Sequence, residues 1–252
     1  AYTYDWGMVT DLARRNLARI TGKLGVEHII VSADIQRKRA NIAGNIKAWL
    51  KRPDLGMIPL FMAGDKQFYY FANVIKKQTG VPLLFFSAGN EMEATGFKTG
   101  FCGIRNGAES GLLATLPLAS KFQLLWHYGK NFALNWAYIS PSLVDTAHAF
   151  ASSYLISHDY HYLFHYLYWD EKEIINVLAD EYQWQLASDT TATWRIGDGT
   201  AAFYNYIYFM IGGLTENDTF RSNQIREGKI DRSTALELVR GENRPRYDTL
   251  QE

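Results

Sequence analysis

The sequence predicts an α/β protein in which a doubly wound parallel sheet precedes a mainly helical C-terminal region. Three observations support this fold class. Strand and helix patterns alternate up to about residue 107, as in parallel sheets with crossover helices. The apolar run from Pro82 to Phe86 ends abruptly in polar residues. Beyond residue 107, aromatic and aliphatic runs at helical spacing replace the strand patterns. We therefore expect an α/β domain over residues 1–107 and a helical region over 108–252, packed as one body.

The first region is predicted to alternate strands and helices. The helix that begins at Thr10 has leucine and isoleucine at helical spacing and is ended by Gly25. The helix that follows Asp34 is basic and is broken at Pro53. The expected order is a strand at 1–7, a helix at 10–24, a strand at 28–32, a helix at 34–52, a helix at 61–77 and a strand at 82–86.

The second region is predicted to be helical. Asp170 followed by Glu173 has the spacing of a capping box and starts a helix that runs to Tyr182. Asp231 is expected to cap the last helix. The other expected helices cover 112–128, 143–156, 160–168 and 201–211. Two histidines of the helix at 160–168, at positions 161 and 165, and His158 just before it are interpreted as core or interface residues rather than as a metal site, because no ligand motif accompanies them.

Composition excludes several functional classes. The 26 basic residues balance 26 acidic ones, so no overall field attracts nucleic acid. The one cysteine, Cys102, excludes an intramolecular disulfide framework and a cysteine-rich zinc site, and it fits a reducing, cytoplasmic setting. No apolar run approaches the roughly 20 residues that span a bilayer, so we expect no transmembrane segment.

Polar side chains follow the predicted strand at 82–86. Asn90, Glu93, Lys98 and Thr99 come after this apolar run, and the carboxyl ends of strands in an open α/β sheet are where ligands bind. Carboxylate and amide oxygens suit Mg²⁺, and lysine suits phosphate oxygens. The pattern therefore predicts a site for a phosphate and its metal. The alternative is an ordinary polar turn after a strand.

Several of these segments resemble a known family. Asn90-Glu91-Met92-Glu93, followed by Phe97 to Phe101, resembles the N-x-x-E and downstream threonine region of NAD synthetase, a member of the N-type ATP pyrophosphatases. Thr3 to Trp6 is similar to that family's second strand, and His28 to Ser32 to its third. Stretches of the C-terminal half resemble the N-acetyl sugar amidotransferase branch; they cover 169–174, 193–200 and 221–228. The resemblance implies an adenine nucleotide alpha hydrolase-like fold.

The resemblance also implies an activity. It is that of an ATP-dependent, adenylate-forming amidotransferase that releases AMP and pyrophosphate and acts on a small molecule, such as a sugar in surface-polysaccharide synthesis. ATP and Mg²⁺ would take part, a separate glutaminase subunit would supply ammonia, and a homo-oligomer is compatible with this activity. Glu93 would bind Mg²⁺ with Asn90 beside it, and Lys98 and Thr99 would hold phosphate oxygens. The nucleoside pocket would be lined by Thr3 and Asp5.

A second polar cluster is predicted to bind anions. Arg195, with the backbone of Gly197 and Gly199, could form an anion-binding turn and would join Lys98 in the catalytic centre. Arg221, Asn223 and Arg226 could grip pyrophosphate or an anionic substrate. Two structural alternatives stay open. Residues 195–200 could be a tight turn whose Asp or Thr caps the following helix, and the arginines could pair with nearby acids at 216, 218 or 227.

One departure from the family is plain. These enzymes carry an S-G-G-x-D-S phosphate loop after the first strand, and nothing in this sequence matches it. Because the chain opens on what resembles the second strand, we expect the loop and the first strand to lie upstream of Ala1. The alternative is a non-catalytic nucleotide-binding or scaffold subunit of the same fold.

Overall fold

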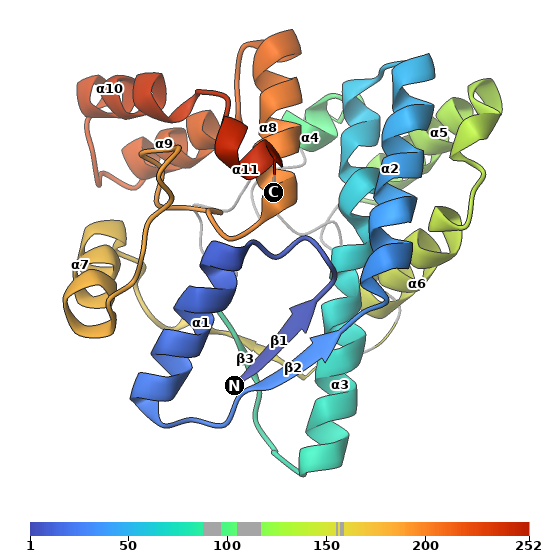
Figure 1. The fold of residues 1–252 in the computed structure, drawn as a ribbon. Coiled ribbons are helices and arrows are strands. Elements are labelled where there is room, and N and C mark those ends of the chain that lie inside the picture. Colours follow the sequence, from blue (N-terminus) through green and yellow to red (C-terminus); the bar gives the residue numbers. More distant parts are fainter. Residues whose placement is uncertain (88–96, 105–116, 155, 157–158, 252) are drawn as a thin grey trace.

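The computed structural model describes residues 1–87, 97–104, 117–154, 156 and 159–251 (Figure 1). The described part is mainly helical, which agrees with the expectation for the C-terminal half, and it contains two small parallel sheets of two strands each. The predicted doubly wound sheet is not shown. The strands that were expected to form one sheet are divided between two.

The first sheet belongs to a strand–helix–strand unit. β1 (Tyr2–Asp5) pairs in parallel with β2 (Ile29–Ser32), and the crossover between them is helix α1 (Asp11–Leu24). Thr10 caps α1 by accepting a hydrogen bond from the amide of Ala13 at 3.2 Å. Gly25 ends it in the left-handed region, with φ of +64°. The predicted order of strand, helix and strand is thus confirmed over residues 2–32.

The next segment departs from its prediction. Asp34 caps α2 (Ile35–Lys51), which stops before Pro53 as expected. The helix predicted over 61–77 is instead a 3₁₀ segment, η1 (Leu55–Gln67), followed by α3 (Phe68–Thr79). The start of η1 is fixed by Asp54, whose side chain accepts from the amide of Gly56 at 2.8 Å. This local cap sets an earlier start than the apolar pattern indicated.

The strand predicted at 82–86 is wrong in length and in burial. β3 spans only Phe85–Phe86, and the side chains of Leu83 and Phe85 are about half exposed. β3 pairs in parallel with β4 (His161–Tyr162), not with β1 or β2. The helix predicted at 160–168 is also wrong, because this stretch forms β4 and the 3₁₀ turn η5 (Leu163–His165). The spacing of apolar residues in such a short aromatic run does not distinguish a strand from a helix. The pairing of β4 with β3 therefore determines its conformation.

The remaining helices surround these sheets. Asp170 and Asp231 cap α7 and α10 as predicted, and the predicted helix at 201–211 is α8. Helix α9 was not predicted, although Thr215 and Asp218 form a capping box at its start. The bounds are α4 (Phe97–Gly100), α5 (Leu118–Leu134), η4 (Trp136–Tyr138), α6 (Ser142–Tyr154), α7 (Glu171–Tyr182), α8 (Gly199–Gly212), α9 (Glu216–Arg226), α10 (Arg232–Glu242) and α11 (Tyr247–Gln251).

The largest apolar core joins both halves of the chain. Trp49 of α2 and Met57 of η1 are buried together with Tyr204 and Tyr208 of α8. A second core packs Tyr4, Trp6 and Ile42 between the first sheet and α2. In Figure 1, α8 to α11 gather at one end, above the carboxyl end of β1. None of the helices in the described ranges is both long and apolar enough to cross a membrane.

Candidate functional site

A buried carboxylate lies where α4, α8 and α9 meet. Glu216, the first residue of α9, has no exposed surface. Its Oε1 forms an ion pair with Nζ of Lys98, and its Oε2 lies 3.4 Å from Nε of Arg195. The hydroxyl of Tyr204 donates to the same Oε2. Lys98 and Glu216 are 118 positions apart in the sequence. The fold thus brings Lys98 and Arg195, both expected in the catalytic centre, to one carboxylate.

Aromatic rings surround Lys98, and Arg195 has an unusual backbone conformation. Phe97 and Phe101 flank Lys98 in α4 and pack against the ring of Tyr208. Nζ of Lys98 also lies 4.3 Å from the centre of the Tyr204 ring. Arg195 adopts a left-handed backbone conformation, with φ of +53°. Such a conformation is uncommon outside glycine and is held by its surroundings, which is a recurrent property of functional sites.

The protonation states of this pair are perturbed. Burial alone would raise the pKa of Glu216, but Arg195, Lys98 and two hydrogen bonds lower it to about 2. Glu216 is therefore ionised at neutral pH. Burial lowers the pKa of Lys98, although the attraction of Glu216 opposes this shift. A buried lysine with a lowered pKa beside a fixed carboxylate is an arrangement typical of binding and catalytic sites.

Asp65, near the end of η1, is a further member that the sequence reasoning missed. Its Oδ1 is buried and accepts no hydrogen bond within the described part of the chain. Burial raises the pKa of Asp65, and Asp198 adds to this effect, while Lys66, Arg195 and Lys98 oppose it. We call the residues Asp65, Lys98, Arg195, Tyr204 and Glu216 the Glu216 cluster.

The glycine turn beside this cluster rests on the segment that follows β1. The carbonyl of Gly197 accepts from the amide of Thr10 at 3.1 Å, and the amide of Gly199 donates to the carbonyl of Met8 at 2.9 Å. Asp198 caps α8 by accepting from the amide of Thr200 at 2.9 Å. The capping alternative for residues 195–200 is thus confirmed. The same turn also carries Arg195 into the Glu216 cluster.

Close packing explains the glycine at position 197. A methyl group there would lie 2.7 Å from Cβ of Ala13 in α1. We expect Gly197→Ala to lower the free energy of unfolding by about 1–3 kcal/mol through this clash. Together with Ala13→Gly, which removes the opposing methyl group, it should cost less than the sum of the two single changes in a double-mutant cycle measured by chemical denaturation. Additive costs would show that the contact with Ala13 does not determine this glycine.

The residues assigned to the nucleoside pocket are engaged within the first sheet. Asp5 is buried, its Oδ2 lies 2.7 Å from Nη1 of Arg14, and its Oδ1 accepts from the amide of Gly7 at 3.0 Å. Oγ1 of Thr3 lies 2.9 Å from Nε2 of His28. Thr99 lies in α4, next to Lys98, and its carbonyl accepts from two amides downstream. A role of Thr3, Asp5 or Thr99 in nucleotide binding stays a prediction.

The arginines of α9 differ from each other. Arg221 is 4% exposed and lies between Glu171 and Glu242, with its Nε 3.1 Å from Oε2 of Glu242. These pairings place Arg221 inside the helical region rather than on a surface, and its partners are not the acids near it in sequence. Arg226 is exposed and donates to Oδ1 of the buried Asn223. Arg221 and Arg226 therefore do not form one donor set.

The remaining predicted positions are the metal-site residues Asn90 and Glu93, and the single cysteine, Cys102. Asn90 and Glu93, the predicted metal-site residues, lie outside the described residues. Within the ranges that the structure describes, no group of three or more His, Cys, Asp or Glu side chains could hold a metal ion. Cys102 is buried, and burial together with Asp54 raises the pKa of its thiol to about 12, so this thiol is neutral at physiological pH.

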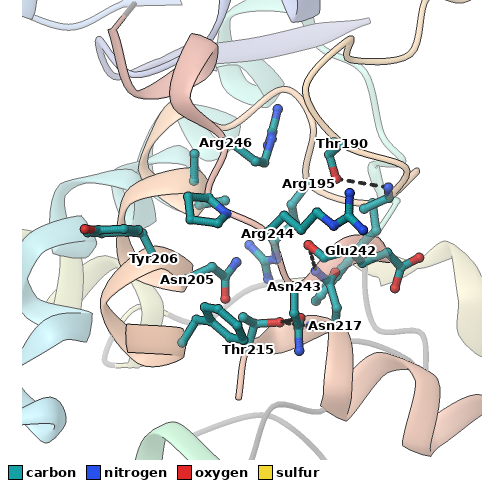
Figure 2. Close-up of a pocket in the computed structure, with 16 residues that line it drawn as sticks. Thr190, Arg195, Asn205, Tyr206, Thr215, Asn217, Glu242, Asn243, Arg244 and Arg246 are labelled. Atoms are coloured by element: carbon teal, nitrogen blue, oxygen red, sulfur yellow. Dashed lines mark hydrogen bonds between the residues drawn. The ribbon is translucent and has the colours of Figure 1, made fainter. Parts of the chain in front are cut away.

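A small pocket, partly open to solvent, adjoins the Glu216 cluster. Figure 2 shows its lining, which comes from the loop at 190–195, from α8, from the start of α9 and from residues 242–246. Arg195 belongs to both the pocket and the cluster. Two further arginines line it: Arg246, whose Nε lies 3.1 Å from Oδ1 of Asp189, and Arg244.

Comparison of the chain with protein-family models, with curated proteins and with solved structures finds no match.

Proposed function

We propose that this chain is part of an ATP-dependent, adenylate-forming amidotransferase in which the Glu216 cluster contacts the phosphates. The observation that carries the proposal is the meeting of Lys98 and Arg195 at one buried carboxylate. Lys98 was expected to hold phosphate oxygens, and Arg195, in a separate segment, was expected to form an anion-binding turn.

The position of the cluster supports the same proposal. The turn that carries Arg195 is hydrogen-bonded to the segment after the carboxyl end of β1, and this end is where parallel α/β units bind ligands. Lys98 and Arg195 would neutralise charge on the phosphates as the bond between the α-phosphorus and the α,β-bridging oxygen breaks. A substrate oxygen would take the place of the leaving pyrophosphate, and ammonia would then displace AMP.

The cluster also fits the divalent cation that such an enzyme requires. Mg²⁺ in ATP-dependent enzymes is bound by one or two carboxylates together with the phosphates of the nucleotide. Asp65 offers a buried carboxylate oxygen that accepts no hydrogen bond from the described residues. Asp65 would therefore be a ligand in addition to, or in place of, the predicted Glu93. Bound Mg²⁺ would supply further neutralisation of phosphate charge.

ATP–pyrophosphate exchange tests this proposal. The 252 residues contain no S-G-G-x-D-S loop, so we expect no exchange from them alone, and exchange once a strand and such a loop precede Ala1. In that extended protein, Lys98→Gln and Arg195→Gln should each lower the exchange rate by roughly 100-fold or more, because charge on the phosphates is largest in the transition state. Arg232→Gln, at an exposed position of α10, is the matched control and should exchange normally.

Melting temperatures measured on the same variants separate loss of activity from loss of folding. Normal exchange in folded Lys98→Gln and Arg195→Gln would contradict the phosphate role of the cluster. Robust exchange by the 252 residues alone would show that the phosphates are held elsewhere.

One rival is a nucleotide-binding or scaffold subunit of the same fold without catalysis. This rival predicts that the extended protein binds ATP, measured by calorimetry, but shows no exchange and forms no AMP with any acceptor. Exchange that depends on Lys98 would exclude it.

A further inference from the structure

We propose that one side of helix α5 is a membrane-binding surface, and that its partner is the surface of a bilayer that contains anionic phospholipids. The proposal adds a peripheral membrane contact to the chain and does not depend on the proposed function. We call this surface the α5 face; its residues are Leu118, Ala119, Phe122, Leu125, Trp126, Gly129 and Ala133.

The other side of α5 holds the helix to the rest of the chain. Leu124 and Asn131 are buried. Nε2 of His127 lies 3.1 Å from Oδ1 of Asp54, the residue that caps η1. The orientation of α5 is therefore fixed, and its α5 face is turned away from these contacts.

The α5 face is apolar and open to solvent. Its large side chains are separated by three, four, seven or eight positions, so they lie next to one another on one side of the helix. Each of them is more than half exposed: Leu118 (74%), Phe122 (69%), Leu125 (59%) and Trp126 (74%). Single exposed apolar residues are normal on a protein surface, but a contiguous group of this kind marks a contact with a protein or a membrane.

Lysines border the α5 face on both edges. At about 3.6 residues per turn the face covers an arc of about 120°, and Lys121 and Lys130 lie just outside its two edges. Lys130 is exposed, and Lys121 is partly exposed. Residues 110–144 contain no aspartate or glutamate, so the formal charge of this stretch is only positive. The charge beside the apolar surface is thus complementary to anionic lipid headgroups.

This composition is typical of a helix that lies in the plane of a membrane surface. Such helices place Trp, Phe and Leu at the boundary of the acyl chains, and their lysines extend to the lipid phosphates. α5 has 17 residues, fewer than the roughly 20 that span a bilayer. Trp136, two residues beyond the end of α5, is 75% exposed and offers a second indole, the side chain that is enriched at membrane interfaces.

A second copy of the chain fits the α5 face less well than a bilayer does. If two copies paired through this face, in parallel or antiparallel, an edge that carries a lysine would meet another edge that carries a lysine. No acidic residue within 110–144 is present to neutralise these charges. Anionic lipids supply the opposite charge on both edges at once.

Flotation of the chain with lipid vesicles tests the proposal. The probes are vesicles of phosphatidylcholine alone and of phosphatidylcholine with about 30% phosphatidylglycerol. We expect the chain to float with the anionic vesicles and much less with the neutral ones. Phe122→Gln combined with Trp126→Gln should weaken vesicle binding by about tenfold or more, because two large apolar side chains then no longer leave water. The melting temperature of this double variant shows whether it is folded.

The matched control is Val177→Gln combined with Leu236→Gln. These two apolar side chains are also exposed, but they belong to α7 and α10, which lie on the opposite side of the view in Figure 1 from α5. The control should bind vesicles as the unchanged chain does. Equal weakening by the two double variants would overturn the proposal, since it would indicate general adsorption of exposed apolar side chains.

Charge is tested separately. Lys130→Glu should weaken binding to the anionic vesicles by about fivefold or more at low ionic strength, and much less in about 0.5 M salt, where the charges are screened. Lys172→Glu, at an exposed position of α7, is the matched control and should bind as the unchanged chain does. Equal effects of the two charge changes would contradict a contact at α5.

The depth of the contact is measured with lipids whose acyl chains carry bromine, which quenches the fluorescence of an indole that enters the bilayer. Trp126→Phe should keep most of the vesicle binding and remove much of the quenching. Quenching that neither Trp126→Phe nor Trp136→Phe reduces would place the membrane contact elsewhere and overturn the proposal.

Two further results would overturn the proposal. One is no flotation with the anionic vesicles up to about 5 mM lipid. The other is a dimer, measured by light scattering, that binds no vesicles and that the Phe122 and Trp126 double variant converts to a monomer, because a second copy would then cover the α5 face. The test is distinct from that of the proposed function. Vesicle binding without ATP–pyrophosphate exchange leaves this proposal standing, and exchange without vesicle binding leaves only the proposed function.

Discussion

Glu216→Gln should lower the free energy of unfolding by about 3–5 kcal/mol, because it leaves Lys98 and Arg195 in the protein interior without their counter-charge. The change keeps the volume of the side chain and its capacity to hydrogen-bond to Tyr204, so the loss measures charge rather than packing. Denaturation by urea at pH 7, followed by circular dichroism, gives the difference. Glu237→Gln, at an exposed position of α10, is the control and should stay within about 0.5 kcal/mol.

The pH dependence of unfolding provides a second test of the role of Glu216. The pKa of Glu216 is lowered from its ordinary value of 4.5 to about 2 in the folded chain. A carboxyl group with a lowered pKa stabilises the fold fully above its unfolded pKa, and this contribution is lost as the pH falls through the folded value. The difference in stability between the unchanged chain and Glu216→Gln should therefore shrink as the pH is lowered from about 5 to 2. A difference that stays constant over this range would show that Glu216 is not ionised in the folded chain.

Arg221→Ala should destabilise the fold by a similar amount, about 3–5 kcal/mol, because two carboxylates then lose the cation between them. Burial alone would raise the pKa of Glu171, and hydrogen bonds from Arg221 help to lower it below its ordinary value. In the variant the pKa of Glu171 should rise, so the destabilisation should be larger at pH 7 than at pH 4. Thermal and urea denaturation at the two pH values check both statements.

Arg226→Ala provides the comparison on the same helix. Arg226 is exposed, and its removal should change the free energy of unfolding by no more than about 0.5 kcal/mol. Arg221→Met combined with Glu242→Leu should recover part of the stability that Arg221→Ala loses, since one unpaired charge is then absent. Equal and small effects of Arg221→Ala and Arg226→Ala would mean that Arg221 is solvated and is not held by Glu171 and Glu242.

The candidate site could be predicted only in part from the sequence. Lys98 and Arg195 were identified through a resemblance, but their partner Glu216 had been considered only as a possible surface acid near Arg221. Asp65 lay within the helix predicted over 61–77 and was not singled out, and its burial became visible only once η1 was packed against α4. Arg244 was not singled out, because a lone arginine after a helix has no local signal. The pocket around it exists only where α8, α9 and residues 242–246 meet.

Local chemistry is what the sequence by itself determined. Thr10, Asp34, Asp170 and Asp231 each cap the helix predicted to follow them, and Gly25 ends α1. Each capping hydrogen bond joins residues three positions apart, so both partners can be read from one short stretch of sequence. The β1–α1–β2 unit was predicted for the same reason, since its strands and its crossover helix follow one another along the chain.

Long-range contacts are what only the tertiary structure decided. The segment at 85–86 pairs with residues 161–162 instead of extending the first sheet, and this pairing turns a predicted helix into a strand. Arg221 finds Glu171 and Glu242, which lie 50 and 21 positions away, in preference to acids of its own helix. Burial determines which carboxylates pair with Arg221, because a charge removed from water is stable only beside an opposite charge with good geometry. The sequence does not state which carboxylate the fold will bring to that place.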